Sequence, residues 1–84
     1  MNNIFMRKID VTENYTPLAS EKIILTVTIS APPTNAGNVL FKADDDSDVP
    51  WVPGEWHQFS SINLAELQVK GTLGDVITII GGTW

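Results

Sequence analysis

The clearest pattern in the chain is the alternation of apolar and polar residues over positions 22–30. The apolar side of this segment consists of Ile23, Leu25, Val27 and Ile29. A period of two residues is typical of a β-strand with one buried face. Ile24 opens the opposite, otherwise polar side, so we expect one end of that side to be covered as well. Pro32 and Pro33 should end the strand, because proline donates no hydrogen bond to a sheet.

Shorter segments of β type lie on both sides of this strand. They cover residues 5–12, 38–42, 55–59, 68–70 and 76–80, with Ile9, Val11, Val39 and Phe41 expected to face inward. Turn-forming residues separate them at 34–37, at Pro53-Gly54 and at 71–75. Residues 63–66 have room for only one helical turn. Six to eight short strands at regular spacing predict an all-β fold, a small antiparallel β-sandwich or jelly roll.

The length of 84 residues fits one domain, residues 1–84, with a flexible N-terminal arm at 1–6 and a flexible tail at 81–84. We expect Gly81 and Gly82 to act as the hinge of that tail. A chain of this size buries only about 60% of its unfolded surface. It has no cysteine and therefore no disulfide. Assembly into a homo-oligomer is the expected source of additional stability.

Charge limits the classes of partner. Ten acidic and five basic residues give a net charge of −5, and the bases are scattered along the chain. A nucleic-acid partner is not expected, because such proteins cluster their bases. The N-terminus lacks the apolar core of a signal peptide, and no apolar stretch is long enough to cross a bilayer. We therefore expect a soluble protein without a membrane partner.

The acidic run at residues 44–48 resembles part of a calcium-binding loop. Its candidate ligands are Asp44, Asp46, Asp48 and Glu55, the last lying eleven residues after the first. Val49 stands where such a loop needs glycine, and Pro50 and Pro53 stiffen the segment. The pattern favours a solvated acidic loop. Repulsion among the acids would make such a loop mobile, unless cations or basic groups of a partner hold it in place. We expect no bound metal and no other cofactor.

His57 is the only histidine and lies close to Ser60 and Ser61. No third group that would orient the imidazole is visible, and there is no strained turn of the Gly-x-Ser-x-Gly type. We therefore predict no catalytic residues and no enzyme.

Three tryptophans are many for so short a chain: Trp51, Trp56 and Trp84. One of them is expected to fill the core. An exposed tryptophan is typical of a protein interface or of stacking on a sugar. All three are therefore interface candidates, and Trp84 is the best because a terminal residue stays ordered only when it docks.

The order of motifs resembles a known class. RKIDVT is followed by PLASEKIILTVTISAPPTNAGNVLF, the turn VPGEW, and NLAELQVKGTLGDVITII. This order is similar to that of small β-sandwich structural proteins of tailed-phage virions. The loop ADDDSDVPWV and the closing GGTW depart from the pattern.

The resemblance implies a capsid decoration or cement protein, made in the host cytoplasm and located in the virion. It would oligomerise, with a trimer as the first expectation, and bind the major capsid protein on the outer surface of a phage head. The alternative is a tail or fibre module that recognises a host-surface glycan or protein through Trp51 or Trp56 and the acidic loop. The chain has no long fibre-forming repeat, which favours the first function.

Overall fold

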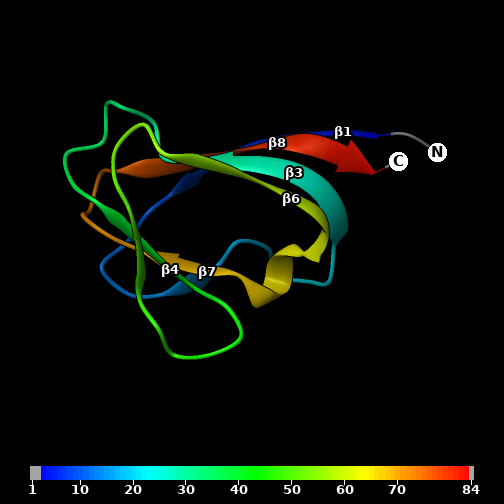
Figure 1. Ribbon diagram of the computed structural model, residues 1–84, viewed down its shortest axis with the longest axis horizontal. Helices are drawn as coiled ribbons and strands as arrows, with labels where there is room; N and C mark the ends of the chain where they lie inside the picture. Colours follow the sequence, from blue (N-terminus) through cyan, green and yellow to red (C-terminus); the bar gives the residue numbers. More distant parts are fainter. Residues whose placement is uncertain (1–2, 84) are drawn as a thin grey trace.

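Two four-stranded antiparallel sheets pack face to face in the computed structural model, which describes residues 3–83 (Figure 1). Sheet A has the strand order β1-β8-β3-β6 and sheet B the order β2-β7-β4-β5. The predicted small β-sandwich is confirmed, at the upper end of the expected strand number. The strands are β1 (Asn3–Asp10), β2 (Thr16–Pro17), β3 (Ile24–Ser30), β4 (Val39–Lys42), β5 (Val49–Trp51), β6 (Trp56–Asn63), β7 (Gln68–Lys70) and β8 (Val76–Thr83).

Strand β3 lies inside sheet A, between β8 and β6, and its alternation matches one buried face and one outer face. Its inward residues Leu25, Val27 and Ile29 are buried, while the intervening threonines are only half-buried. They pack with inward residues of the other strands, and the two apolar faces exclude water from the space between the sheets. The core members from those strands include Val39, Phe41, Val69, Ile77 and Ile79. The predicted inward positions at Val39 and Phe41 are confirmed.

The predicted helical turn is present as a 3-10 turn, η1 (Leu64–Glu66). The Asn63 side-chain oxygen caps it by accepting hydrogen bonds from the backbone N–H of Ala65, at 3.1 Å, and of Ile23, at 3.2 Å. Leu64 is fully buried beneath the turn. One polar side chain therefore joins η1 to the start of β3.

Strand β8 continues beyond Ile80, and this corrects the expected hinge. Gly81 lies in the strand and pairs with Phe5 on one side and Val27 on the other. A Cβ atom at Gly81 would lie 2.1 Å from the Thr26 carbonyl oxygen, so glycine here permits a close approach of two strands. Gly82 is also paired in β8, and Trp84 lies outside the described residues.

The N-terminal arm expected at residues 1–6 is likewise replaced by a strand from Asn3 onward. Strand β1 pairs with β8 over its whole length, from Asn3 opposite Thr83 to Asp10 opposite Val76. Residues 1 and 2 lie outside the described part of the chain. The first and last strands of the chain are thus neighbours, and β1 forms one edge of sheet A.

Candidate functional site

The outer face of sheet A carries a small group of exposed apolar side chains at the β1 edge. The register places Met6 opposite Ile80 and Ile4 opposite Gly82. Ile4 is 82% exposed, Met6 66% and Ile80 52%. We call Ile4, Met6 and Ile80 the apolar patch. Contiguous apolar side chains on a sheet face are typical of a surface that another molecule covers.

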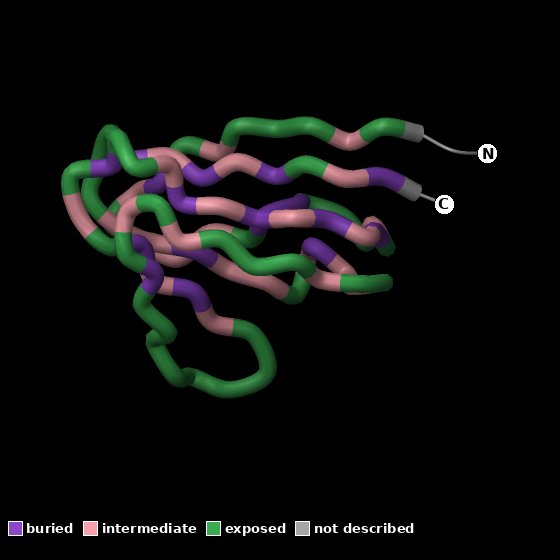
Figure 2. The backbone as a smooth tube through the Cα atoms, turned by 45° about the horizontal axis from the view of Figure 1, so that its top comes forward, coloured by how far each residue is buried: buried purple, intermediate pink, exposed green. Residues whose placement is uncertain are grey.

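Strand β1 also presents an open sheet edge. Within residues 3–83 its only paired neighbour is β8, so alternate residues direct their backbone N–H and C=O groups away from the sheet. The strand leading from the N-terminus lies along one margin of the molecule and is mostly exposed (Figure 2). Its eight residues contain no proline and no break in register. This edge therefore lacks two of the common features that prevent strand addition.

The opposite edge of sheet A, strand β6, is built differently. Its pairing with β3 shifts by one residue between Leu25 and Val27. Ser61 lies at this bulge with a positive φ of 54°, and its N–H donates to the Thr26 hydroxyl at 3.2 Å. A bulge twists an edge strand and interrupts its ladder, which disfavours pairing with another chain. Of the two edges of sheet A, β1 is the more regular one. Its exposed Arg7 and Lys8 are charges of the kind that protect an edge, so any added strand must accommodate them.

The β1 edge is also basic in an otherwise acidic protein. Arg7 and Lys8 are two of the five basic residues, and both are exposed. The Arg7 guanidinium lies over the Phe5 ring, 4.2 Å from its centroid. Arginine on an aromatic face is a favourable cation–π arrangement. The edge therefore combines apolar area with positive charge.

The tryptophans divide into a core residue and a surface residue. Trp51 is only 5% exposed and packs against Phe41, with ring centroids 4.0 Å apart. It is therefore the tryptophan that fills the core, and its selection as an interface candidate is wrong. Trp56 is 62% exposed on β6 and keeps its candidacy. Trp84 lies outside the described residues.

His57 does have a partner that orients its ring, and the sequence reasoning missed it. Its Nε2 atom lies 2.6 Å from Glu55 Oε2, and its ring meets Trp51 edge-on at 4.8 Å. The other Glu55 oxygen accepts the Val52 N–H at 3.0 Å. The hydrogen bond from His57, followed by that from Val52, lowers the pKa of Glu55 below its usual value. Glu55 thus closes the Pro53-Gly54 turn and positions His57.

The acidic loop is tied to the body of the protein at one point. The Tyr15 hydroxyl donates a hydrogen bond to Asp48, and Lys42 and Lys70 lie over the Tyr15 ring at 4.4 and 4.8 Å. Desolvation, and then the hydrogen bond to Asp48, raise the pKa of Tyr15 to about 12. Asp45 accepts the Ser47 N–H at 2.7 Å, which closes a local turn.

The four candidate calcium ligands do not come together. Glu55 is engaged with Val52 and His57, and Asp48 with Tyr15. Across residues 3–83, no three His, Cys, Asp or Glu side chains gather as they would around a metal ion. The resemblance to a calcium loop is therefore limited to the spacing of the residues.

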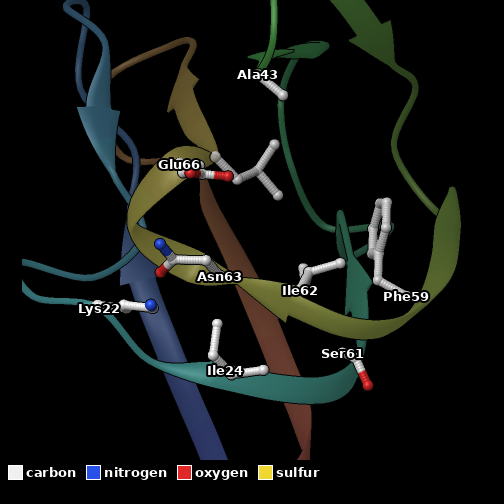
Figure 3. Close-up of a pocket in the computed structure, with 9 residues that line it drawn as sticks. Lys22, Ile24, Ala43, Phe59, Ser61, Ile62, Asn63 and Glu66 are labelled. Atoms are coloured by element: carbon white, nitrogen blue, oxygen red, sulfur yellow. The ribbon is translucent and has the colours of Figure 1, made fainter.

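An open hollow of about 700 Å³ lies at one end of the sandwich, beside η1 (Figure 3). Its walls include the apolar residues Ile24, Phe59, Ile62 and Leu67, with Lys22 and Glu66 among the polar ones. The Ser61 side chain points away from the others (Figure 3). The Asn63 oxygen is already used in capping η1. The hollow therefore offers apolar contact but few polar groups to orient a small ligand.

Comparison with protein-family models, with curated proteins and with solved structures found no match. None of the helical segments in residues 3–83 is long and apolar enough to span a membrane. The fold and the surface together define a small two-sheet β-protein with an open apolar sheet edge.

The apolar patch was not among the candidates from the sequence. The sequence feature that could have indicated the apolar patch is the run Ile4-Phe5-Met6. Three consecutive apolar residues in a strand must place side chains on both of its faces. We expected an arm at residues 1–6 and a strand only from residue 5, so Ile4 and Met6 were not recognised as neighbours on one face. Ile80 joins them only through the pairing of β1 with β8.

Proposed function

We propose that this protein is a structural component that binds other protein chains through the outer face of sheet A, and that it decorates the outer surface of a phage head. The observation that carries the binding function is the apolar patch, which lies beside the open edge of β1. The assignment to a phage head rests on the resemblance in motif order. The partner would be the major capsid protein, and the location the virion.

The two sides of the sandwich differ in a way that fits this role. The loop of residues 43–48 extends from sheet B on the side opposite β1 and β8 (Figures 1 and 2). It carries four aspartates, while the apolar patch lies on sheet A. Binding through sheet A would cover the apolar side chains and leave the charged loop in water, where ionised carboxylates are most stable. The bound protein would then add negative charge to the particle surface.

The second candidate is a tail or fibre module that binds a host glycan or protein. Trp56 favours it, because this ring is 62% exposed on β6 and is free to stack on a sugar. The residues that lie in line with Trp56 across the neighbouring strands are Ser30 on β3 and Thr78 on β8. Their hydroxyls lie 2.5 Å apart. The Ser30 and Thr78 hydroxyls already bond to each other, and Lys8 is the further polar residue in the same line, so few free groups remain for a sugar and the first candidate is stronger.

The test is binding to capsids assembled without this protein. We expect cosedimentation of the intact chain at a copy number comparable to that of the major capsid protein, and at least tenfold weaker binding for Ile80→Lys, because a charge in the covered patch must be desolvated. Leu73→Lys is the matched control, since Leu73 is 71% exposed in a turn outside the patch. Binding that is unchanged by Ile80→Lys, or absent for the intact chain, would contradict the proposal. A few copies per virion would support the tail module.

A further inference from the structure

We infer that strand β1 is a self-pairing edge: two copies of this chain join antiparallel through β1 to form one continuous eight-stranded sheet. The resulting dimer would have a twofold axis perpendicular to the sheet. This inference concerns self-association and goes beyond the proposed binding to a capsid.

Sheet A ends at β1 and at β6, and only β6 carries a bulge and a positive φ. Strand β1 is regular over eight residues and pairs on one side only. An added strand would satisfy the backbone groups on its free side.

Opposite residues in a continuous sheet share a face, so the twofold axis must run midway between the two copies of one β1 residue, which then pairs with itself. Centring the pair on Arg7 or on Lys8 would place identical positive charges opposite each other, which is unfavourable. Centring it on Met6 avoids this and joins Asn3 through Ile9, whereas centring on Phe5 would shorten the ladder to Asn3 through Arg7.

The register centred on Met6 pairs each basic residue of β1 with an apolar or aromatic residue of the partner copy. Arg7 would lie opposite Phe5 of the partner copy, and that ring already attracts a guanidinium within one chain, at 4.2 Å. Lys8 would lie opposite Ile4 of the partner copy, where its aliphatic stem covers apolar surface and its amine stays in water. Basic residues thus face apolar or aromatic ones at each of these pairs.

The same register explains the apolar patch. The axis keeps both outer faces on one side of the joined sheet, so the two copies of Ile4, Met6 and Ile80 form a single strip. Met6 would contact Met6 of the partner copy at the centre, and Ile80 lies directly beside it on β8. Part of the patch is then buried in the dimer, and the remainder forms a doubled surface for a further partner. The dimer replaces the trimer expected from the resemblance.

The absence of cysteine from the chain allows a direct test by cross-linking. In Met6→Cys the two introduced thiols would lie directly opposite, with Cβ atoms ~4.5–5.5 Å apart, so a small adjustment of the strands brings them to the upper end of the disulfide range at ~4.5 Å. We expect mild oxidation to convert most of this variant to a covalent dimer. Gln58→Cys is the matched control, because Gln58 is exposed on the same face but on the β6 edge, and it should remain monomeric.

Mixing variants tests the register. An equimolar mixture of Ile4→Cys and Lys8→Cys should form the mixed dimer in preference to either self-linked product. Cross-linking of Met6→Cys to Gln58→Cys would instead show head-to-tail pairing of β1 with β6 and overturn the inference. Preferential self-linking of Lys8→Cys would overturn the register.

Analytical ultracentrifugation measures the self-association of the chain without introduced cysteines. We expect reversible dimerisation and, for Met6→Lys, a dissociation constant raised at least tenfold, because two like charges would meet at the axis. Circular dichroism and Tm would establish that Met6→Lys is folded. An intact chain that is monomeric up to millimolar concentration would refute self-pairing, and capsid binding by such a monomer would leave the proposed function standing.

Discussion

Asn35 and the backbone of Val76 exchange two hydrogen bonds. The Asn35 Nδ2 donates to the Val76 carbonyl at 2.8 Å, and the Val76 N–H donates to Asn35 Oδ1 at 3.0 Å. The preceding residue, Asp75, accepts the N–H groups of Ala36 and Gly37 at 2.8 and 3.1 Å. The connection between β3 and β4 is thus fastened to the start of β8. Both polar side chains are buried, so their hydrogen bonds are made in a poorly solvated site.

Loss of the Asn35 amide should destabilise the fold. Asn35→Ala leaves the Val76 N–H and C=O without their partner, and unsatisfied buried groups cost about 1–3 kcal/mol each. We expect the free energy of unfolding in urea to fall by about 2–4 kcal/mol. The control is Asn38→Ala, because Asn38 is exposed in the same connection. Equal stability of the two variants would contradict a structural role for Asn35.

Gly81→Ala tests the close approach of β8 and β3. The added methyl group would collide with the Thr26 carbonyl, 2.1 Å away, and with the Val27 backbone, 2.7 Å away. Backbone atoms cannot rotate aside as a side chain does, so we expect a loss of about 3 kcal/mol or a chain that does not fold. At Gly37 the nearest atom is the Thr72 hydroxyl, at 3.2 Å, so Gly37→Ala should cost less. A hinge at Gly81 would instead tolerate alanine, and thermal denaturation distinguishes the two.

The tryptophans should differ sharply in their effect on stability. Trp51→Ala removes a buried ring that contacts Phe41 and His57, and we expect a loss of about 3–5 kcal/mol. Trp56→Ala removes an exposed ring and should change the free energy of unfolding by less than about 1 kcal/mol. Urea denaturation followed by circular dichroism measures both. A comparable loss in the two variants would mean that Trp56 is part of the core.

Tyr15 is the only tyrosine, so the absorbance of tyrosinate reports on it alone. Its pKa is raised to about 12 in the folded protein, from a usual value of 10.0. Stability linked to Tyr15 is therefore fully present below pH 10 and is lost as the pH rises toward 12. Asp48→Asn removes the carboxylate and should bring the pKa of Tyr15 closer to its usual value. An unchanged titration in this variant would show that the loop is not anchored through Asp48.

Glu55 gives the opposite pH dependence. Its pKa is lowered by the hydrogen bonds from His57 and Val52, so the stabilisation is present above the usual carboxyl pKa of 4.5 and is lost as the pH falls through the lower folded value. We expect Glu55→Gln to be less stable than the parent chain at pH 6 and to approach it under acid conditions. The effect should be small, because both side chains of the pair are in contact with solvent. Melting curves across this pH range, with Glu21→Gln as an exposed control, would detect it, and parallel curves for the two variants would refute it.

Much of the fold was predictable because alternation is a local property. The strand around Val27, the turn at Pro53-Gly54 and the helical turn after Asn63 each depend on neighbouring residues, and the structure has all three. The ends of the chain were not predictable in this way. Glycine is a poor strand former, and at position 81 only the close contact with β3 makes it the residue that fits.

The candidate site depended on the tertiary structure even more. The separation of Trp51 from Trp56 depends on how strands β5 and β6 sit in the sandwich, since one ring is buried and the other exposed. The pairing of His57 with Glu55, two residues apart, is by contrast a local contact that the alternation of a strand could have indicated. The acids at 44–48 had a suggestive spacing, but Tyr15, thirty-three residues before Asp48, determines where one of them points. A linear spacing carries no information about such distant partners.

The sequence by itself determined that the chain is a small all-β protein whose strands bury one face, because its apolar residues recur with a period of two. The tertiary structure alone decided which residues are left uncovered. Ile4 and Met6 lie near Ile80 because the first strand pairs with the last, some seventy residues away along the chain. Strand order is a nonlocal choice, and it is strand order that leaves β1 at the edge of sheet A.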